Sequence, residues 1–210
     1  MRVVIFLILL MALAAPAFAS EPGYFKVSGV AAGDVLNIRA APDPKAETIG
    51  EFQPETVAIE VLEVVSTGVG EWGRVLAADT DGWVSMKFLE TFTVTYIPGT
   101  ELPSGLQCSG TEPFWDSVLS DGNLSFSAID QSEESQPLVS AVTTLGRQYR
   151  YALVSESGSK RMTAIIAQDH ECSDGMSDRR YRWRIDLLRE DGAGTAMPVA
   201  YEGCCRLPAR

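Results

Sequence analysis

Short runs of alternating or β-branched residues, each bounded by turn residues, limit the fold of this chain more than any other feature. The runs occupy 35–39, 56–65, 72–77, 83–89, 124–129, 149–154, 162–167 and 181–187. A period of two places successive side chains on opposite faces of a strand, and no long stretch shows the period of an amphipathic helix. The pattern predicts an all-β fold, with a small barrel in the first half and an antiparallel β-barrel or sandwich in the second.

Residues 1–19 have the composition of a secretory signal peptide. Arg2 precedes an apolar run that ends at Pro16, and Ala17 and Ala19 are the small residues that a signal peptidase reads. The run is shorter than the roughly 20 apolar residues needed to cross a bilayer. No Cys follows the cleavage position to receive a lipid. We therefore expect an exported protein, periplasmic or extracellular, without a stable membrane anchor.

A change in composition at 91–105 divides the rest of the chain. Pro98 and Pro103, each close to a glycine, interrupt any regular element there. We expect 91–105 to be a linker between a first domain at 24–90 and a second, disulfide-stapled β-rich domain at 106–206.

All four cysteines lie in the second domain, where export makes disulfides the default. A bond between the neighbours Cys204 and Cys205 would need a strained ring. Two pairings remain open: Cys172 with Cys204 and Cys108 with Cys205, or the exchanged set. A zinc site is disfavoured, because no Cys-x-x-Cys pair occurs and the chain has a single histidine, His170.

The first domain carries a series of motifs in an order typical of one family. The motifs are Leu36-Asn37-Ile38-Arg39-Ala40-Ala41-Pro42, Ile49-Gly50, Val57-Ala58-Ile59, Trp72-Gly73-Arg74-Val75, Asp81-Gly82-Trp83-Val84-Ser85 and Phe88-Leu89. In this order they resemble a bacterial SH3 domain across 24–90. The resemblance implies an SH3-like small barrel that binds a peptide or a cell-wall component and catalyses no reaction. Within the motifs, we expect Pro42 and Gly82 to set turns.

Trp72 follows a glycine-rich loop. Core packing is the favoured explanation for this residue, and the other is an exposed aromatic on which a ligand packs, which makes Trp72 a candidate ligand-binding residue. The formal net charge of the chain is −11, and 24–90 holds five basic and eleven acidic residues. This charge disfavours nucleic acid and anionic wall polymers as partners. It favours a peptidoglycan peptide or an envelope protein.

Two cysteine-containing motifs punctuate the second domain. They are Cys108-Ser109-Gly110-Thr111-Glu112-Pro113-Phe114-Trp115 and Cys172-Ser173-Asp174-Gly175-Met176-Ser177-Asp178. Together they resemble a family of exported bacterial proteins, often lipoproteins, whose function is uncharacterised, and this chain lacks the lipobox often seen there. Because Phe114 and Trp115 are adjacent in an extended segment, their rings should point to opposite faces. Trp115 is the second candidate ligand-binding residue.

Four carboxylates surround Cys172 and are the secondary candidates for a calcium site. They are Asp169, Glu171, Asp174 and Asp178. Their spacing departs from a calcium-binding EF-hand loop, because Asp174 stands where glycine is required. We expect a solvated acidic turn, no metal and no cofactor. With one histidine and no Gly-x-Ser-x-Gly elbow, the sequence also predicts no catalytic residue.

These observations predict an exported, non-enzymatic binding protein of the cell envelope, whose SH3-like domain docks a cell-wall peptide or a protein partner. One alternative is a proteinaceous inhibitor of cell-wall hydrolases, comparable to a lysozyme inhibitor. The other is a targeting module joined to an envelope enzyme.

Overall fold

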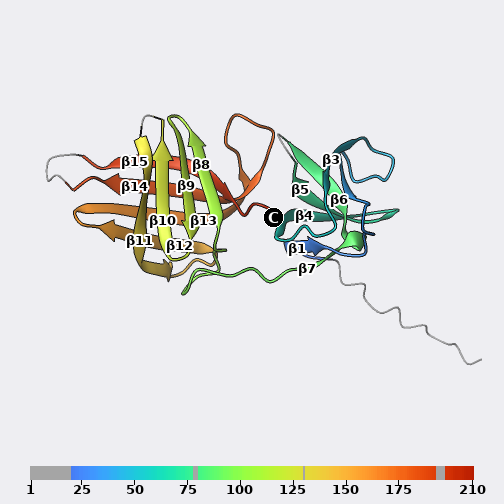
Figure 1. The fold of residues 1–210 in the computed structure, drawn as a ribbon, viewed down its shortest axis with the longest axis horizontal. Helices are drawn as coiled ribbons and strands as arrows, with labels where there is room; N and C mark the ends of the chain where they lie inside the picture. Colours follow the sequence, from blue (N-terminus) through green and yellow to red (C-terminus); the bar gives the residue numbers. More distant parts are fainter. Residues whose placement is uncertain (1–19, 78–79, 130, 193–196) are drawn as a thin grey trace, which may run out of the picture.

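A computed structural model describes residues 20–77, 80–129, 131–192 and 197–210 (Figure 1). The expected signal peptide lies outside the described residues. Fifteen strands and one 3-10 helix, Met86–Phe88, form the regular structure of the described part, which confirms the all-β prediction. No helix in that part is long and apolar enough to span a bilayer.

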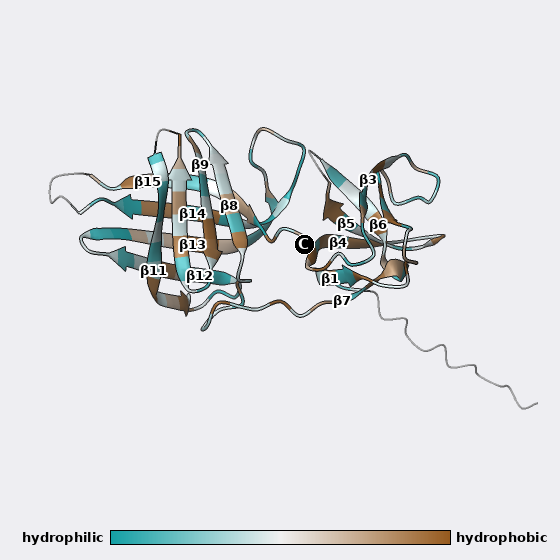
Figure 2. Ribbon diagram, viewed as in Figure 1, coloured by the Kyte–Doolittle hydropathy of each residue, from teal (hydrophilic) through white to brown (hydrophobic). Residues whose placement is uncertain are grey.

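The first seven strands form one antiparallel sheet in the order β3-β2-β6-β5-β4-β1-β7, so that β3 and β7 are its edges. The bounds are β1 Gly23–Val27, β2 Leu36–Arg39, β3 Thr48–Phe52, β4 Ile59–Thr67, β5 Gly70–Leu76, β6 Asp81–Ser85 and β7 Leu89–Thr91. Side chains from several strands form a common core that includes Ile38, Val61, Val75 and Val84, all almost fully buried. Figure 2 shows the hydrophobic colouring of β4 and β5.

Gly82 serves packing rather than a turn, contrary to our expectation. It lies in β6, and its φ is outside the left-handed region. A Cβ atom at this position would overlap the side chain of Ile38 on β2. The glycine is needed because β2 and β6 approach each other closely at this point.

The last eight strands form a closed barrel in the order β10-β11-β12-β13-β14-β15-β8-β9. The bounds are β8 Leu106–Thr111, β9 Phe114–Ser120, β10 Asn123–Ala128, β11 Gln131–Thr143, β12 Arg150–Ser157, β13 Lys160–Cys172, β14 Tyr181–Glu190 and β15 Val199–Arg206. The alternation in β14 buries Tyr181, Trp183, Ile185 and Leu187. Of the two architectures expected, the barrel is the one formed.

Two disulfides join Cys108 to Cys205 and Cys172 to Cys204, the first of the two pairings that the sequence left open. Adjacent residues of a strand point to opposite faces. Cys204 and Cys205 therefore cannot both bond to cysteines on the same side of β15. Cys205 and Cys108 belong to the barrel core, whereas Cys204 and Cys172 form a separate small cluster with Tyr181. The two disulfides therefore lie on opposite sides of β15.

The sheet and the barrel are in contact through the chain segments that flank them. Figure 1 shows the C-terminal end lying between the two. Leu207 packs with Tyr24, Ala58 and Val94 in one apolar cluster. Just beyond it, the N–H of Val57 donates to the carbonyl oxygen of Arg210 at 2.7 Å, and the reverse bond measures 3.0 Å.

The expected linker is also packed rather than free. Ile97 and Leu102 are buried within the core cluster of the barrel. A backbone bridge between Tyr96 and Pro103 closes the turn between them. The segment therefore contributes side chains to the barrel core.

Candidate functional site

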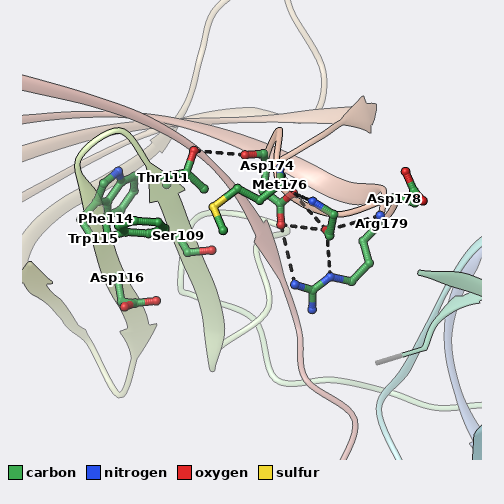
Figure 3. A pocket seen from close by; sticks show the side chains of 11 residues that line it. Ser109, Thr111, Phe114, Trp115, Asp116, Asp174, Met176, Asp178 and Arg179 are labelled. Atoms are coloured by element: carbon green, nitrogen blue, oxygen red, sulfur yellow. Dashed lines mark hydrogen bonds and ion pairs between the residues drawn. The ribbon is translucent and has the colours of Figure 1, made fainter. Parts of the chain in front are cut away.

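The two cysteine-containing motifs meet at one end of the barrel, around a pocket of about 440 Å³ (Figure 3). Its walls are the β8–β9 hairpin and the loop 173–180. The lining residues are Ser109, Gly110, Thr111, Phe114, Trp115, Asp116, Asp174, Met176, Ser177, Asp178 and Arg179. The hydroxyl of Thr111 donates to the carbonyl oxygen of Asp174 at 3.2 Å, which ties the two motifs together. We call this space the barrel-end pocket.

Asp174 organises the loop side of the barrel-end pocket. Its carboxylate accepts hydrogen bonds from the Tyr181 hydroxyl at 2.7 Å and from the N–H of Ser177 at 2.9 Å. It also accepts the Ser177 hydroxyl and the N–H of Met176, both at 3.0 Å. Burial by itself would raise the pKa of Asp174, but these hydrogen bonds prevail and lower the pKa to about 2. The carboxylate therefore stays ionised at neutral pH and holds the loop in one conformation.

Trp115 closes the bottom of the barrel-end pocket. It is 2% exposed, and its ring stacks on Phe126 at 5.9 Å between centroids. A Cβ atom at Gly110 or at Gly203 would overlap the Trp115 ring, so two glycines make room for it. Phe114 and Trp115 point to opposite faces, as expected. The ring that packs in the core is that of Trp115, the candidate ligand-binding residue. Its role in binding stays a prediction.

The exposed apolar side chains of the barrel-end pocket are ones that the sequence analysis did not select. Phe114 is 48% exposed and Met176 is 65% exposed. Alternation along β9 shows that one of the two adjacent rings faces outward, but it does not say which. Asp116 and Asp178 also line the pocket, and neither forms an ion pair with any other described residue. The rim thus combines apolar surface with negative charge.

The four calcium candidates do not come together. Asp169 pairs with Arg184 at 3.1 Å, Glu171 pairs with Arg180 at 3.1 Å, and the Asp174 carboxylate is occupied as described above. Within the ranges that the structure describes, no three His, Cys, Asp or Glu side chains are grouped so that they could hold a metal ion.

A second space, of about 480 Å³, lies where the segment after β15 passes the first sheet. Residues of β2, β3, β4 and β5 line one side, and 206–209 together with Arg179 line the other. The members from the sheet are Ile38, Ile49, Gly50, Glu51, Phe52, Ile59, Glu60, Val75, Leu76 and Ala77. We call this space the sheet groove. Its floor is apolar because Ile38, Ile59 and Val75 belong to the core of the sheet.

Most of the sheet that carries this groove lies in a segment that matches one protein-family model. Residues 34–90 match the family model of the bacterial SH3 domain. The match runs from the approach to β2 as far as β7, and it confirms the resemblance drawn from the motifs for that part of the chain. Comparison with curated proteins and with solved structures found no match. Below, the sheet β1–β7 is called the SH3 sheet.

Trp72, the first candidate ligand-binding residue, lies inside the SH3 sheet. It is 5% exposed, which agrees with core packing, the favoured of the two explanations, and not with an exposed ring. The glycine-rich loop ends before it, and Trp72 sits within β5, where it pairs with Val65 on β4 and Ser85 on β6. A central position between two strands explains the burial. Trp72 lines neither the sheet groove nor the barrel-end pocket.

A buried polar group joins the SH3 sheet to the barrel. The Tyr24 hydroxyl donates to Glu60 at 3.2 Å and accepts from the Trp183 indole N–H at 3.4 Å. Burial raises the pKa of Glu60 to about 7, although Arg182 and the Tyr24 hydrogen bond oppose the shift. The second Glu60 oxygen and two Arg182 nitrogens are buried without a hydrogen-bond partner among the described residues. Glu60 and Arg182 are therefore buried at the contact between the SH3 sheet and the barrel. Keeping such groups charged there has a high free-energy cost.

Proposed function

We propose that this chain is an exported, non-catalytic binding protein of the bacterial cell envelope, and that its SH3 sheet docks a cell-wall peptide or an envelope protein. The observation that carries the proposal is the match of 34–90 to the bacterial SH3 domain, which is a cell-wall-associated binding module. The apolar floor of the sheet groove beside the edge strand β3 supplies a surface on which such a ligand can lie.

Two features support export. Both disulfides are of the kind that persists in an oxidising compartment outside the cytosol. The apolar leader at 1–19 has the order of charge, apolar run and small residues that secretion requires.

The absence of catalysis is part of the proposal, and the chemistry of the barrel-end pocket supports it. His170 is the single histidine of the chain, and it lines neither the sheet groove nor the barrel-end pocket. The most strongly perturbed carboxylate of the barrel-end pocket, Asp174, has a lowered pKa and accepts several hydrogen bonds, which suits a structural role. A general acid or base needs a pKa near the working pH. Glu60 in the sheet groove has such a pKa, but its side chain is buried and accepts a hydrogen bond from the Tyr24 hydroxyl.

Co-sedimentation of the full mature chain with purified peptidoglycan tests the proposal. We expect the chain to pellet with peptidoglycan, and amides of β2 to β6 to become protected from hydrogen exchange when it does. Phe114→Ala, in the barrel-end pocket, is the control and should pellet like the wild type. Failure to pellet at low and at moderate salt would overturn a wall ligand.

The barrel-end pocket favours a second candidate function, inhibition of cell-wall hydrolases. Exposed Phe114 and Met176 next to the unpaired Asp116 and Asp178 form an apolar and acidic rim that complements a basic enzyme surface. A lysozyme turbidity assay with a micromolar excess of the chain tests this candidate. We expect slower lysis, restored by Phe114→Ala and not by Leu145→Ala, an exposed apolar residue elsewhere. An unchanged rate would remove this function for that enzyme.

A further inference from the structure

We infer that Ser20 is the first residue of the mature protein, and that the α-ammonium group created there by removal of the leader forms an ion pair with Glu71 of the SH3 sheet. The inference rests on export, which is one part of the proposed function. It adds the position of the processing site, the group that receives the new charge, and a gain in stability that the precursor lacks.

The contact between Ser20 and Glu71 joins the segment before β1 to the strand β5. The backbone nitrogen of Ser20 lies 3.2 Å from Glu71 Oε1 and 3.4 Å from Glu71 Oε2, and the Ser20 hydroxyl donates to Oε2 at 2.8 Å. Both residues are partly buried, and 51 positions of sequence separate them. One residue thus directs two donors at one carboxylate.

The position of the Ser20 nitrogen suits an ammonium group better than an amide. In the precursor this nitrogen belongs to the Ala19–Ser20 peptide bond and carries one proton, although it lies within 3.5 Å of both carboxylate oxygens. An ammonium group has three protons and a full positive charge. Its hydrogen bonds to a carboxylate are roughly twice as strong as those between neutral groups. The contact therefore gains most when the nitrogen becomes charged.

Glu71 has no cationic partner among the side chains that the structure describes. No Lys, Arg or His side chain of those residues lies within 4.0 Å of its carboxylate. Across the ladder, β4 places the uncharged Ser66 opposite Glu71. Residues 24–90 hold five basic and eleven acidic residues, so this carboxylate stands in a region of excess negative charge. The α-ammonium group of Ser20 supplies the positive charge that these side chains do not.

The sequence places the processing step at the same residue. Ala17 and Ala19 are the small residues that a signal peptidase reads, so the enzyme would cut after Ala19. Hydrolysis breaks the C–N bond between Ala19 and Ser20. The oxygen of the attacking water joins the Ala19 carbonyl carbon, which leaves as a carboxylate, and the two hydrogens of the water complete the ammonium group of Ser20. A sequence pattern and a tertiary contact thus agree on Ser20 independently.

The segment held by this ion pair also lies at the junction of the two regions. Ser20, Glu21 and Gly23 line a space of about 560 Å³ together with Arg182 of β14. The strand that follows, β1, pairs with β4 and with the edge strand β7. We therefore expect processing to stabilise the SH3 sheet where it meets the barrel.

Mass spectrometry of the protein recovered from the periplasm of an expressing bacterium locates the processing site. We expect Ser20 to be the first residue. A different first residue in an exported chain would overturn the inference and leave the proposed function standing. A chain that keeps Met1 and stays in the cytosol would overturn both the inference and the export that the proposed function includes.

Four forms of the chain test the ion pair. The mature chain and a longer form that keeps residues 17–19, in which the Ser20 nitrogen is an amide, are each made with and without Glu71→Gln. At pH 6 the mature wild type should melt about 2 °C above the longer form, the shift expected of one ion pair in a chain of this length. The two Glu71→Gln forms should melt together. Glu55→Gln removes an exposed carboxylate that has no ion pair among the described residues, and it should leave the difference intact.

The pH dependence distinguishes the ion pair from a structural effect of the three extra residues. Glu71 favours the charged form of the α-amino group, so the pKa of that group should lie above its ordinary value of about 8. The stabilisation is then complete below about pH 8 and is lost as the pH rises through the raised pKa. All four forms keep Glu21, Glu60 and Arg182, so the titration of these groups cancels in the comparison. A melting difference that persists at pH 10, or one that Glu71→Gln leaves unchanged at pH 6, would overturn the inference and leave the proposed function standing.

Discussion

The barrel is closed, whereas the SH3 sheet is open and ends in two edge strands. Residues that belong to the barrel side of the chain form one wall of its groove. In the barrel, two disulfides and the hydrogen bonds of Asp174 hold the pocket-forming loop from within. In the SH3 sheet, the groove is completed by Arg206, the last residue of β15, and by residues 207–209, which follow it directly. The barrel-end pocket is thus a local structure, and the sheet groove depends on how the two regions meet.

Removal of a disulfide should affect the barrel most. The double variant Cys108→Ala/Cys205→Ala opens a cross-link spanning 97 residues, and we expect the free energy of unfolding of the barrel to fall by about 4 to 5 kcal/mol. Guanidinium denaturation monitored by hydrogen exchange measures the loss of stability separately for the barrel and for the SH3 sheet. If the amides of β2 to β6 lost as much protection from exchange as those of the barrel, the two regions would unfold together. That result would contradict the contrast between the barrel and the SH3 sheet.

The second disulfide provides the matched control. Cys172→Ala/Cys204→Ala opens a cross-link spanning 32 residues, so the chain-entropy loss should be about 1 kcal/mol smaller. This variant should also release the loop 173–180 and with it the barrel-end pocket.

The contact between the regions should depend on pH through Glu60. Its pKa is about 7 in the folded chain because burial disfavours the charged form, against an ordinary value of 4.5. A raised pKa means that the folded state holds the proton more tightly than the unfolded state. The stabilisation is therefore complete below about pH 4.5 and is lost as the pH rises through about 7, with a total of roughly 3 kcal/mol.

Glu60→Gln tests this dependence, because the amide is neutral at every pH. Urea denaturation at about pH 5 and about pH 8 should show a fall in wild-type stability that the variant lacks. Tyr24, Arg182 and Arg206 are the other ionisable groups that act on Glu60, and the variant keeps all three. A wild type equally stable at both pH values would contradict the burial of Glu60.

Gly110→Ala should damage the barrel end without touching the SH3 sheet. The added methyl group overlaps Trp115 and the carbonyl oxygen of Glu202, and overpacking of this kind costs about 2 kcal/mol. Thermal unfolding measures the change. Gly68→Ala, in the turn between β4 and β5 with no atom close to the added methyl group, is the control and should unfold like the wild type.

Tyr181→Phe should give the smallest effect. It removes a hydrogen bond to the ionised Asp174, worth about 1.5 kcal/mol at neutral pH. Because the folded-state pKa of Asp174 is lowered, its contribution is present above about pH 4 and is lost as the pH falls through about 2. The difference between wild type and variant should shrink over that interval in acid denaturation, and a difference independent of pH would contradict the assignment.

Particular residues show how far sequence reasoning reached. The alternation at 181–187 correctly predicted a strand, and β14 buries Trp183 and Ile185 on one face, because successive side chains of a strand point to opposite faces. The same rule placed Phe114 and Trp115 on opposite faces but could not say which ring was exposed. For Trp72 the neighbouring loop left exposure open beside core packing, and the structure buries the residue within the ladder between β4 and β6.

The candidate sites were less predictable than the fold. The two cysteine-containing motifs were visible in the sequence, but their contact through Thr111 and Asp174 joins residues far apart in the chain. The sheet groove had no sequence signal, since Leu207 and Pro208 follow the last strand in a segment with no motif. The four carboxylates near Cys172 were close in sequence, and yet Asp169, Glu171 and Asp174 took separate partners.

By itself the sequence determined the all-β class, the strands at the eight alternating or β-branched runs, the family of 34–90 and the fact that neighbouring cysteines must bond to different partners. These properties depend on short-range geometry, in which a strand alternates its side chains and turn residues end it. Only the tertiary structure decided that the barrel closes, which aromatic ring faces water and where the two halves touch. Those outcomes depend on contacts between residues distant in sequence, whose free energies are set by the packing of the whole chain.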